Sequence, residues 1–401
     1  MDLNDTPDQA EYRATVRAWI EANKSKAPTH LGDDDESVAA HRAWQRELAG
    51  GKLVGITWPQ EFGGGGRGPL EMVIANQEIS RAEIPGIFDV IGVGMLGPTI
   101  IAHGSEAQKE RYLDPMLHAE EVWCQLFSEP AAGSDLAGIQ ARAKQLDDGS
   151  WKVSGQKVWT TNAQHAQYGL LLARTDSDVP KHKGLTMFIV PMDAEGITIR
   201  PLRQIDGHPD FNEVFLDDVV LDAGSEVGAV GGGWGVALTT LMFERLAIGG
   251  SIDALGFRSD AIAEAIITDE AASQDPEVRH RLGAIATDLT AIKFFGFRLL
   301  TQLQKGQIPG PEAGLAKITA VNAGIAAGDL LVDVDGIGAL DEPSAKKLVS
   351  FMPGLKSAGG TEQILKNTIG ERVLGLPPEP RLDKGIPFSE LKSLEKEGAT
   401  A

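Results

Sequence analysis

Apolar side chains recur with two different periods along the chain, and the change of period divides it into three parts. In residues 1–120 they recur every three or four positions, as in "DQAEYRATVRAWIEANK" (8–24) and "PLEMVIANQEISRAE" (69–83), which predicts amphipathic helices. In residues 121–235 they alternate over short stretches, which predicts strands. From 236 to 401 the helical spacing returns. The pattern predicts an α+β multidomain protein in which an all-β domain lies between two helical domains.

The individual elements follow from the same pattern. "ARAKQLDDGSWKVSGQKVWTTN" (141–162) predicts two strands joined by an Asp-Asp-Gly turn. Further strands are predicted at 168–176, 184–193, 196–204 and 212–222. Helices are predicted at 39–50, 236–268, 277–305, 311–332, 343–352 and 361–374. The polar tail from residue 377 onward is predicted to be loosely held.

Composition restricts the possible functions. A chain of 401 residues is too long for one compact core, and a net charge of −20 argues against a nucleic-acid or anionic-membrane binder. The longest apolar run, "VIGVGMLGPTII" (90–101), is too short to span a membrane. The acidic N-terminus lacks a signal-peptide pattern and Cys124 is the single cysteine, so a cytoplasmic protein is expected. The eight histidines show no metal-ligand spacing, and no metal site is predicted.

One carboxylate stands out in the apolar helix "LMFERLAIGG" (241–250). Glu244 shares a helix face with Leu241 and Ile248, where a carboxylate costs free energy unless something pairs it or uses it. It is either a working base or half of an ion pair with Arg245. Adjacent residues do not face each other on a helix, which weakens the ion-pair interpretation.

Four quoted stretches together carry a resemblance. In "LFSEPAAGSDLAG" (126–138), small residues and turn-formers let backbone amides approach a ligand, although a plain surface turn would look similar. "WPQEFGG" (58–64) and "GSEAQKERYLDPML" (104–117) precede it, and "GQKVWTTNA" (155–163) follows. In this order they resemble the acyl-CoA dehydrogenase family over essentially the whole chain.

The resemblance implies a fold, a cofactor and a reaction. Family members have a helical domain, a middle antiparallel β-barrel or sandwich domain and a C-terminal four-helix bundle, and they assemble as dimers or tetramers that bind FAD. An acyl-CoA loses its α-proton to a carboxylate and its β-hydrogen, as hydride, to flavin N5. Electrons then pass to an electron-transfer flavoprotein, as in fatty acid β-oxidation and related lipid metabolism. Two alternatives are an acyl-CoA oxidase and an FAD-binding partner subunit of a hetero-oligomeric dehydrogenase.

The resemblance also implies roles for individual residues. Phe127 and Ser128 would contact the flavin ring, Trp159 would cover one flavin face, and Thr161 would bond near the ring. Thr361 would be a further cofactor contact. The alternative for Trp159 is a core tryptophan of the β domain.

Three more residues would contact the substrate. By the same resemblance, Gly133 and Ser134 would lie near the acyl-CoA, with Ser134 as a hydrogen-bond donor, and Arg245 would reach the CoA side. For Arg245 the alternative is a simple salt bridge to a nearby acid.

The family has two placements for the catalytic base. One is a glutamate in a C-terminal turn, which here reads "SAGGTEQILKN" (357–367), and Gly359 stands at the glutamate's position. Glu362 lies past that turn and is a poor substitute. The other placement is on the helix that opens the C-terminal domain, directly before an arginine. Glu244 matches it, so the resemblance implies that Glu244 is the base.

Two cofactor-contacting segments of the family are altered here. Ala272 replaces the arginine that reaches a neighbouring chain's FAD pyrophosphate, and Val332 and Asp335 replace a glutamine and a glycine of a second segment. Either Arg279 or Arg281 compensates, or the partner is a different chain that supplies the missing residues.

A further stretch agrees with a mixed oligomer and a large substrate. "GQIPGPEAGLAKI" (306–318) resembles bacterial dehydrogenases for bulky acyl chains, some of which act on steroid side chains as two-chain complexes. A group of small residues would leave room for a branched or wide acyl group: Gly249, Gly250, Ser251, Gly359 and Gly360.

Overall fold

The chain is described by a computed structural model. It covers residues 5–30, 32–249, 270–305, 307, 310–341, 343–381 and 383–391. Of residues 245–249, 300, 303, 304, 343 and 344 only the backbone is described. The contacts divide the chain into two compact units. The first comprises described residues of Met1–Gln204, His208–Phe243 and Glu379–Ala401, and the second those of Ile205–Gly207 and Glu244–Pro378.

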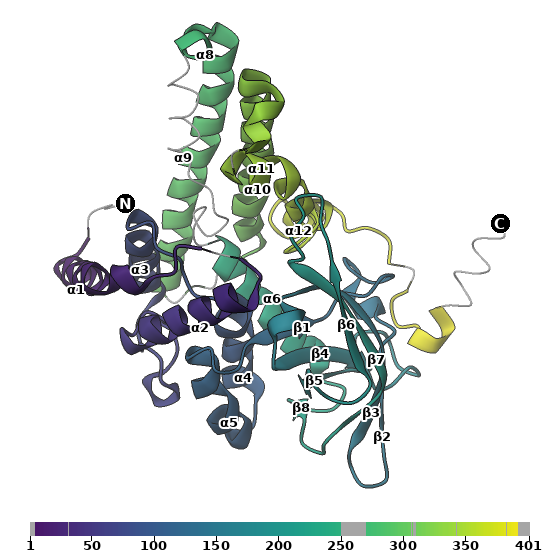
Figure 1. The fold of residues 1–401 in the computed structure, drawn as a ribbon. Coiled ribbons are helices and arrows are strands. Elements are labelled where there is room, and N and C mark those ends of the chain that lie inside the picture. Colours follow the sequence, from purple (N-terminus) through teal and green to yellow (C-terminus); the bar gives the residue numbers. More distant parts are fainter. Residues whose placement is uncertain are drawn as a thin grey trace. The chain divides into compact units, whose positions relative to one another are not determined.

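The first unit begins with helices, which Figure 1 shows from purple to blue. They are α1 (Pro7–Asn23), α2 (Asp35–Gly50), α3 (Pro69–Arg81), α4 (Gly97–His103) and α5 (Glu106–Leu117). The helices predicted at 8–24, 39–50 and 69–83 are confirmed. Helix α2 starts four residues before the predicted position because the Asp34 side chain caps it by accepting from the Ser37 amide.

The apolar run 90–101 forms a π-helical turn, Gly92–Leu96, that leads directly into α4. Asp89 precedes this turn and is buried. Its carboxylate accepts from the Gly92 amide at 2.8 Å and from the Trp123 amide at 3.2 Å. Burial raises the pKa of Asp89 to about 7. This carboxyl therefore joins the π-helical turn to the first strand.

The middle part of the first unit is one eight-stranded sheet. Its strands are β1 (Trp123–Leu126), β2 (Arg142–Gln145), β3 (Trp151–Thr161), β4 (Tyr168–Arg174), β5 (Leu185–Pro191), β6 (Ile197–Leu202), β7 (Phe211–Leu221) and β8 (Glu226–Val227). The spatial order is β6-β7-β3-β2-β4-β5-β8, and β1 pairs with β4. The sheet is mostly antiparallel, as predicted, but β4 runs parallel to both β1 and β2.

Strand β4 explains how the helices and the sheet share one unit. Leu170 and Leu172 pack into the core that also contains side chains of the N-terminal helices, whereas Leu171 and Ala173 pack into a second core within the β part. Alternate side chains of a strand point to opposite faces. Because both faces of β4 are covered, its sequence is a continuous apolar run rather than an alternating one.

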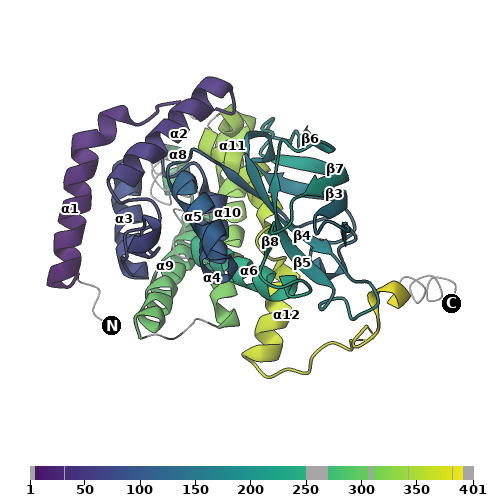
Figure 2. The ribbon, with the colours of Figure 1, turned by 90° about the horizontal axis from the view of Figure 1, so that it is seen from below.

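The second unit is helical. Its elements include the C-terminal end of α6 (Gly233–Gly249), α8 (Glu270–Gln274), α9 (Pro276–Gln304), α10 (Gly314–Asp335), α11 (Pro343–Ser350) and α12 (Glu362–Arg372). Helices α9 and α10 pack side by side, as Figure 2 also shows. Small residues on α10, among them Ala316, Ala320, Ala323 and Ala327, are buried in the core of this unit and permit close helix packing.

One segment, Pro311–Asp341, is long and apolar enough to cross a membrane by length and composition. Of its most apolar window, 61% is buried inside the protein. A central helix of a packed helical domain has the same properties, and α10 forms the core of the second unit in this way.

The polar tail is attached to the first unit, in contrast to the loosely held segment that the sequence predicted. The amides of Phe388 and Ser389 donate to the carbonyls of Val179 and Ser177. The Phe388 ring lies 3.5 Å from the guanidinium carbon of Arg174. Composition does not reveal this attachment because its contacts are with residues about two hundred positions earlier.

Candidate active site

A buried ion pair joins the two motifs of the first unit. Lys157 lies on β3 and Glu129 in the turn after β1, and the Lys157 ammonium is 2.8 Å from a carboxylate oxygen of Glu129. The ammonium also donates to the carbonyls of Phe127 at 3.0 Å and Leu172 at 2.8 Å. Burial lowers the pKa of Lys157 to about 8, and Glu129 opposes that shift.

The Glu129 carboxylate also fixes the far end of the same motif. The carboxylate accepts from the amides of Gln140 at 2.6 Å and Ala141 at 2.9 Å. Each of these hydrogen bonds involves a charged acceptor, so each is stronger than a neutral one. Glu129 thereby closes residues 129–141 into a loop with both ends tied to one carboxylate.

Next to this ion pair, the alternation of inward and outward side chains along β3 is interrupted. Its pairing with β7 shifts register between Lys157 and Thr160, and Trp159 has a φ of 59°. A bulge of this kind re-aims side chains, and positive φ is costly for a bulky residue. The Val158 amide donates to the Ser128 carbonyl at 2.9 Å, so the bulge lies beside the motif after β1.

The bulge turns Trp159 outward. The chain has seven tryptophans, all among the described residues, and Trp159 alone is exposed, with 61% of its surface accessible. Its ring makes an edge contact with Phe211, with ring centroids 5.9 Å apart. The alternative of a core tryptophan is therefore wrong. A strained backbone that presents an indole to solvent is typical of a ligand site.

The other predicted residues of the first unit lie around this place. Phe127 is buried and its carbonyl is held by Lys157, while Ser128 and Thr161 are half-buried. Gly133 and Ser134 are exposed in the loop that Glu129 closes.

A buried arginine holds the end of the same loop. The Arg174 guanidinium donates to the carbonyls of Ala137 at 2.6 Å and Ile139 at 3.2 Å. Burial lowers the pKa of Arg174 to about 10. Lys181 binds Asp135 of the loop and Asp383 of the tail, at 2.8 Å and 2.6 Å. The tail and the motif loop are therefore held by the same two cations.

Helix α6 carries the predicted base and is anchored one turn before it. Thr240 is buried and its hydroxyl lies 3.0 Å from the Thr99 hydroxyl of α4. The Thr239 hydroxyl lies 2.8 Å from Nε2 of His103. Glu244 follows on the same helix and is half-buried within the second unit. The side chain of Arg245 and residues Gly250 and Ser251 lie outside the described part of the chain.

The turn that contains Gly359 and Gly360, where the family's other base would lie, belongs to the second unit. Gly359 and Gly360 have φ values of 63° and 90°, which glycine adopts without strain. Thr361 is the N-cap of α12. Glu362 binds Lys366 at 2.5 Å and lies 3.9 Å from Lys356, and Lys366 holds the pKa of Glu362 below its usual range.

Buried Lys317 of α10 supports this turn. Its ammonium donates to the Gly360 carbonyl at 2.8 Å and contacts the Lys356 carbonyl at 3.4 Å.

The altered cofactor segments also lie in the second unit. Ala272 is buried on α8. Asp335 is exposed at the end of α10. Arg281 binds Asp333 at 2.6 Å, and Arg279 donates to the Ser273 carbonyl at 3.2 Å. Each of the two arginines considered as replacements thus has a partner within its own unit.

The sequence alone indicated no role for Lys157, Glu129 or Lys317. The pattern of β3 could have identified Lys157, because Trp151 and Val153 point inward and residue 157 is separated from them by an even number of positions. A lysine at an inward position requires an acidic partner. For Lys317 the corresponding signal is its position among the small apolar residues of α10.

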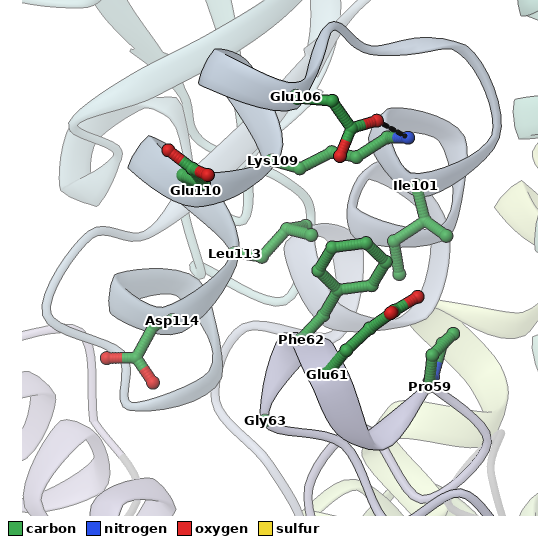
Figure 3. Close-up of a pocket in the computed structure, with 10 residues that line it drawn as sticks. All are labelled: Pro59, Glu61, Phe62, Gly63, Ile101, Glu106, Lys109, Glu110, Leu113 and Asp114. Atoms are coloured by element: carbon green, nitrogen blue, oxygen red, sulfur yellow. Dashed lines mark hydrogen bonds and ion pairs between the residues drawn. The ribbon is translucent and has the colours of Figure 1, made fainter.

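A pocket in the first unit does not coincide with these residues. It has a volume of about 480 Å³ and lies between α5 and the loop around Phe62 (Figure 3). It is lined by Pro59, Glu61, Phe62, Gly63, Ile101, Glu106, Lys109, Glu110, Leu113 and Asp114. Four carboxylates against one lysine disfavour an anionic ligand such as a CoA thioester.

Comparison with protein families finds three matching domains. The acyl-CoA dehydrogenase N-terminal domain matches residues 6–120, the middle domain matches 124–219 and the C-terminal domain matches 231–374. Acyl-CoA dehydrogenase IpdE1 of Mycobacterium tuberculosis is 37% identical and covers 93% of this chain and 99% of its own length. The mitochondrial short-chain specific acyl-CoA dehydrogenase of Homo sapiens is 31% identical over 82% of each chain.

Solved structures agree with the sequence matches. The Tcur3481-Tcur3483 steroid ACAD has a TM-score of 0.80 at 26% identity and covers 94% of this chain and 100% of its own. The ChsE4-ChsE5 complex from Mycobacterium tuberculosis has a TM-score of 0.77 at 26% identity with the same coverage. Both are named as pairs of different proteins.

Proposed function

This chain belongs to the acyl-CoA dehydrogenase family, and from that premise we propose which of its residues carry the reaction. The activity is the α,β-dehydrogenation of an acyl-CoA thioester to the 2-enoyl-CoA by an FAD-dependent oxidoreductase. The reaction needs a carboxylate within reach of the substrate's α-carbon. We assign that role to Glu244.

The observation that carries this assignment is that neither Gly359 nor Glu362, at the family's other base position and just after it, offers a suitable base. Gly359 offers no carboxylate, and its φ of 63° would strain a glutamate placed there. Glu362 is bound by Lys366, which favours its ionised form and makes it a weak proton acceptor. Glu244 is half-buried on a helix anchored by Thr240, as a positioned base requires.

The first unit has features that fit a flavin. Trp159 presents an indole beside Ser128 and Thr161, and the buried hydroxyl of Thr160 has no hydrogen-bond partner among the described residues. FAD, when bound, supplies the acceptor for the substrate's β-hydride. Ser128, Trp159 and Thr161 would hold the isoalloxazine ring, and Phe127 would shape the strand behind it. Thr361 would be a further cofactor contact.

The substrate is proposed to be a bulky acyl-CoA. Gly133 and Ser134 are exposed in a loop that Glu129 and Arg174 hold in place, where the Ser134 hydroxyl would donate a hydrogen bond to the acyl-CoA. Arg245 would bind on the CoA side. The structure named as a steroid ACAD supports a wide acyl group. Gly359 and Gly360 are consistent with it, although their positive φ gives a second reason for glycine.

We further propose that the functional enzyme pairs this chain with a related one. The methyl side chain of Ala272 cannot pair with a pyrophosphate as an arginine would, and Arg281 is already paired with Asp333. The exposed carboxylate of Asp335 would repel a phosphate. The two structures named as complexes of different proteins support a mixed oligomer. Electrons would pass to an electron-transfer flavoprotein.

Replacement of Glu244 tests the central assignment. In the purified holoenzyme, Glu244→Gln is expected to abolish bleaching of the flavin by an acyl-CoA that bleaches the wild type. Glu362→Gln is the matched control and is expected to keep bleaching. The opposite pattern would move the base to α12. Reoxidation of the reduced enzyme by air would identify an oxidase instead.

The need for a partner is tested by the visible spectrum of the chain purified alone. Little flavin per polypeptide, restored when the chain is co-purified with a related chain, is the expected result. About one FAD per chain in a homomer would rule the mixed oligomer out. A flavin-loaded complex in which Glu244→Gln has no effect would leave this chain as a non-catalytic subunit.

A further inference from the structure

The loop between β4 and β5, residues 175–184, joins two segments that lie far apart in the sequence. It contacts the motif loop, residues 129–141, and the C-terminal tail, of which residues 383–391 are described. All three segments belong to the first unit. The motif loop carries Gly133 and Ser134, the proposed acyl-CoA contacts, so the tail is connected to the proposed substrate site through one loop.

Lys181 forms the first link. Its ammonium donates to both carboxylate oxygens of Asp135, at 2.9 Å and 2.8 Å, and lies 2.6 Å from a carboxylate oxygen of Asp383 in the tail. Asp135 directly follows Ser134 in the chain. The Lys181 side chain is 14% exposed, whereas that of Asp135 is 60% exposed. One largely buried cation therefore restrains an exposed part of the motif loop, next to the residue that would bind the ligand.

Arg174 forms the second link. Besides the carbonyls of Ala137 and Ile139 in the motif loop, its guanidinium donates to the Lys181 carbonyl at 3.1 Å. Arg174 is only 3% exposed, and the Phe388 ring of the tail lies 3.5 Å from its guanidinium carbon. At this distance the ring and the cation form a cation–π contact. The tail thus helps to bury the cation that holds the motif loop.

The backbone of the tail pairs with the same loop between β4 and β5. The amides of Phe388 and Ser389 donate to the carbonyls of Val179 and Ser177, at 3.0 Å and 2.8 Å. A terminal segment held by a few such contacts opens at a small cost in free energy. Its attachment is therefore an equilibrium that a ligand bound to the motif loop can shift.

We propose that Lys181 and the C-terminal tail are positioning elements of the acyl-CoA site: together they hold the motif loop in the conformation in which Gly133 and Ser134 bind the ligand. This inference rests on the acyl-CoA contacts proposed above for those two residues. Detachment of the tail weakens acyl-CoA binding and leaves the chemical step unchanged. Because coupling between two binding events is reciprocal, bound acyl-CoA must also hold the tail more firmly.

Single-turnover reduction of the flavin in the holoenzyme tests the first half of this coupling. The probe is the first of butyryl-CoA, octanoyl-CoA and cholyl-CoA that bleaches the wild-type flavin, and its concentration dependence gives the Kd and the limiting rate separately. Lys181→Met is expected to raise the Kd about fivefold or more, with the limiting rate and the flavin content unchanged. Asp383→Asn removes only the partner in the tail and is expected to raise the Kd by less.

Two further variants serve as controls. Lys181→Arg keeps the charge and is expected to stay near the wild-type Kd. Lys183→Met removes an exposed lysine of the same loop and is expected to change nothing. An unchanged Kd in Lys181→Met and Asp383→Asn, or an equal rise in Lys183→Met, would overturn the inference. If Lys181→Met does not fold, Asp383→Asn decides, because its change lies in the tail.

Limited digestion with trypsin tests the second half without measuring turnover. Cleavage after Lys384, followed by mass spectrometry, is expected to slow about fivefold when the same acyl-CoA is saturating, and Lys181→Met is expected to abolish this protection. Equal cleavage with and without the acyl-CoA would overturn the coupling. A wild-type flavin that no acyl-CoA bleaches would overturn the proposed function and this inference together, whereas bleaching with an unchanged Kd in the variants would overturn this inference alone.

Discussion

The ammonium of Lys157 and the carboxylate of Glu129 lie 2.8 Å apart, and both side chains are buried. One of them belongs to the strand that carries Trp159 and the other to the loop that carries Ser134. The pair therefore fixes two segments relative to each other that are far apart in sequence. The proposed flavin and substrate contacts are both supported by this link.

Lys157→Met is expected to lower the free energy of unfolding by about 3–5 kcal/mol, because it leaves the Glu129 carboxylate buried without its cation. Urea denaturation of the purified protein measures this. The matched control is Lys152→Met on the same strand, which removes an exposed ion pair with Asp218 and is expected to have little effect. Similar losses in both variants would contradict a special role for the buried pair.

Trp159→Ala is expected to weaken FAD binding by roughly 2- to 10-fold, which corresponds to about 0.5–1.5 kcal/mol of aromatic contact. Stability is expected to stay near the wild-type value because the side chain is exposed. Titration of the apo-enzyme with FAD measures the affinity. Trp151→Phe, at a buried position of the same strand, serves as the control. If Trp159→Ala lowered stability and left FAD affinity unchanged, Trp159 would have a structural role instead.

The raised pKa of Asp89 predicts that the free energy of unfolding depends on pH. Its folded-state pKa is about 7, above the ordinary value of 3.8, so the folded state binds more protons between these two pH values. Stability from this group is present at low pH and is lost as the pH rises through 7. Relative to Asp89→Asn, the wild type is expected to lose about 2–3 kcal/mol between about pH 5 and pH 8. Urea midpoints at both pH values check this, and parallel curves for the two proteins would contradict it.

Phe388→Ala is expected to loosen the loop that Arg174 holds, because the ring covers the guanidinium that binds the carbonyls of Ala137 and Ile139. The direct loss is about 1 kcal/mol of cation–π contact. Hydrogen exchange at residues 136–141 should rise. Ser389→Ala is the control because the Ser389 contact uses only its backbone amide. Equal exchange in the two variants would show that the tail does not stabilise the loop.

The periodic elements of this fold follow from the sequence. The strands predicted at 168–176 and 212–222, and the helix predicted at 311–332, are confirmed as β4, β7 and α10. Each has a regular alternation or a sustained apolar run, and burial of such faces decides local structure. Strand β1 was missed because its four residues are too few to show a period.

The details of the site depend on places where the periodic pattern of apolar residues is interrupted. Trp159 is exposed because a register shift after Lys157 reverses the inward and outward positions of β3. Periodicity alone assigns no such shift. The partners of Lys157 and Lys317 are a carboxylate and carbonyls brought close by the fold, so their contacts were not predictable from spacing. The roles of Glu244 and Trp159 came from resemblance, and the structure adds the environment in which to test them.

The path of the backbone has a practical consequence. The chain leaves the first unit after Phe243 and returns to it at Glu379, so the long segment of the second unit, Glu244–Pro378, is inserted into the first, while its short segment Ile205–Gly207 comes from between β6 and β7. A nick at either end of the long segment leaves the two units joined through the remaining connections. Expression of Glu244–Pro378 alone needs two new chain ends and omits Ile205–Gly207 of the same unit.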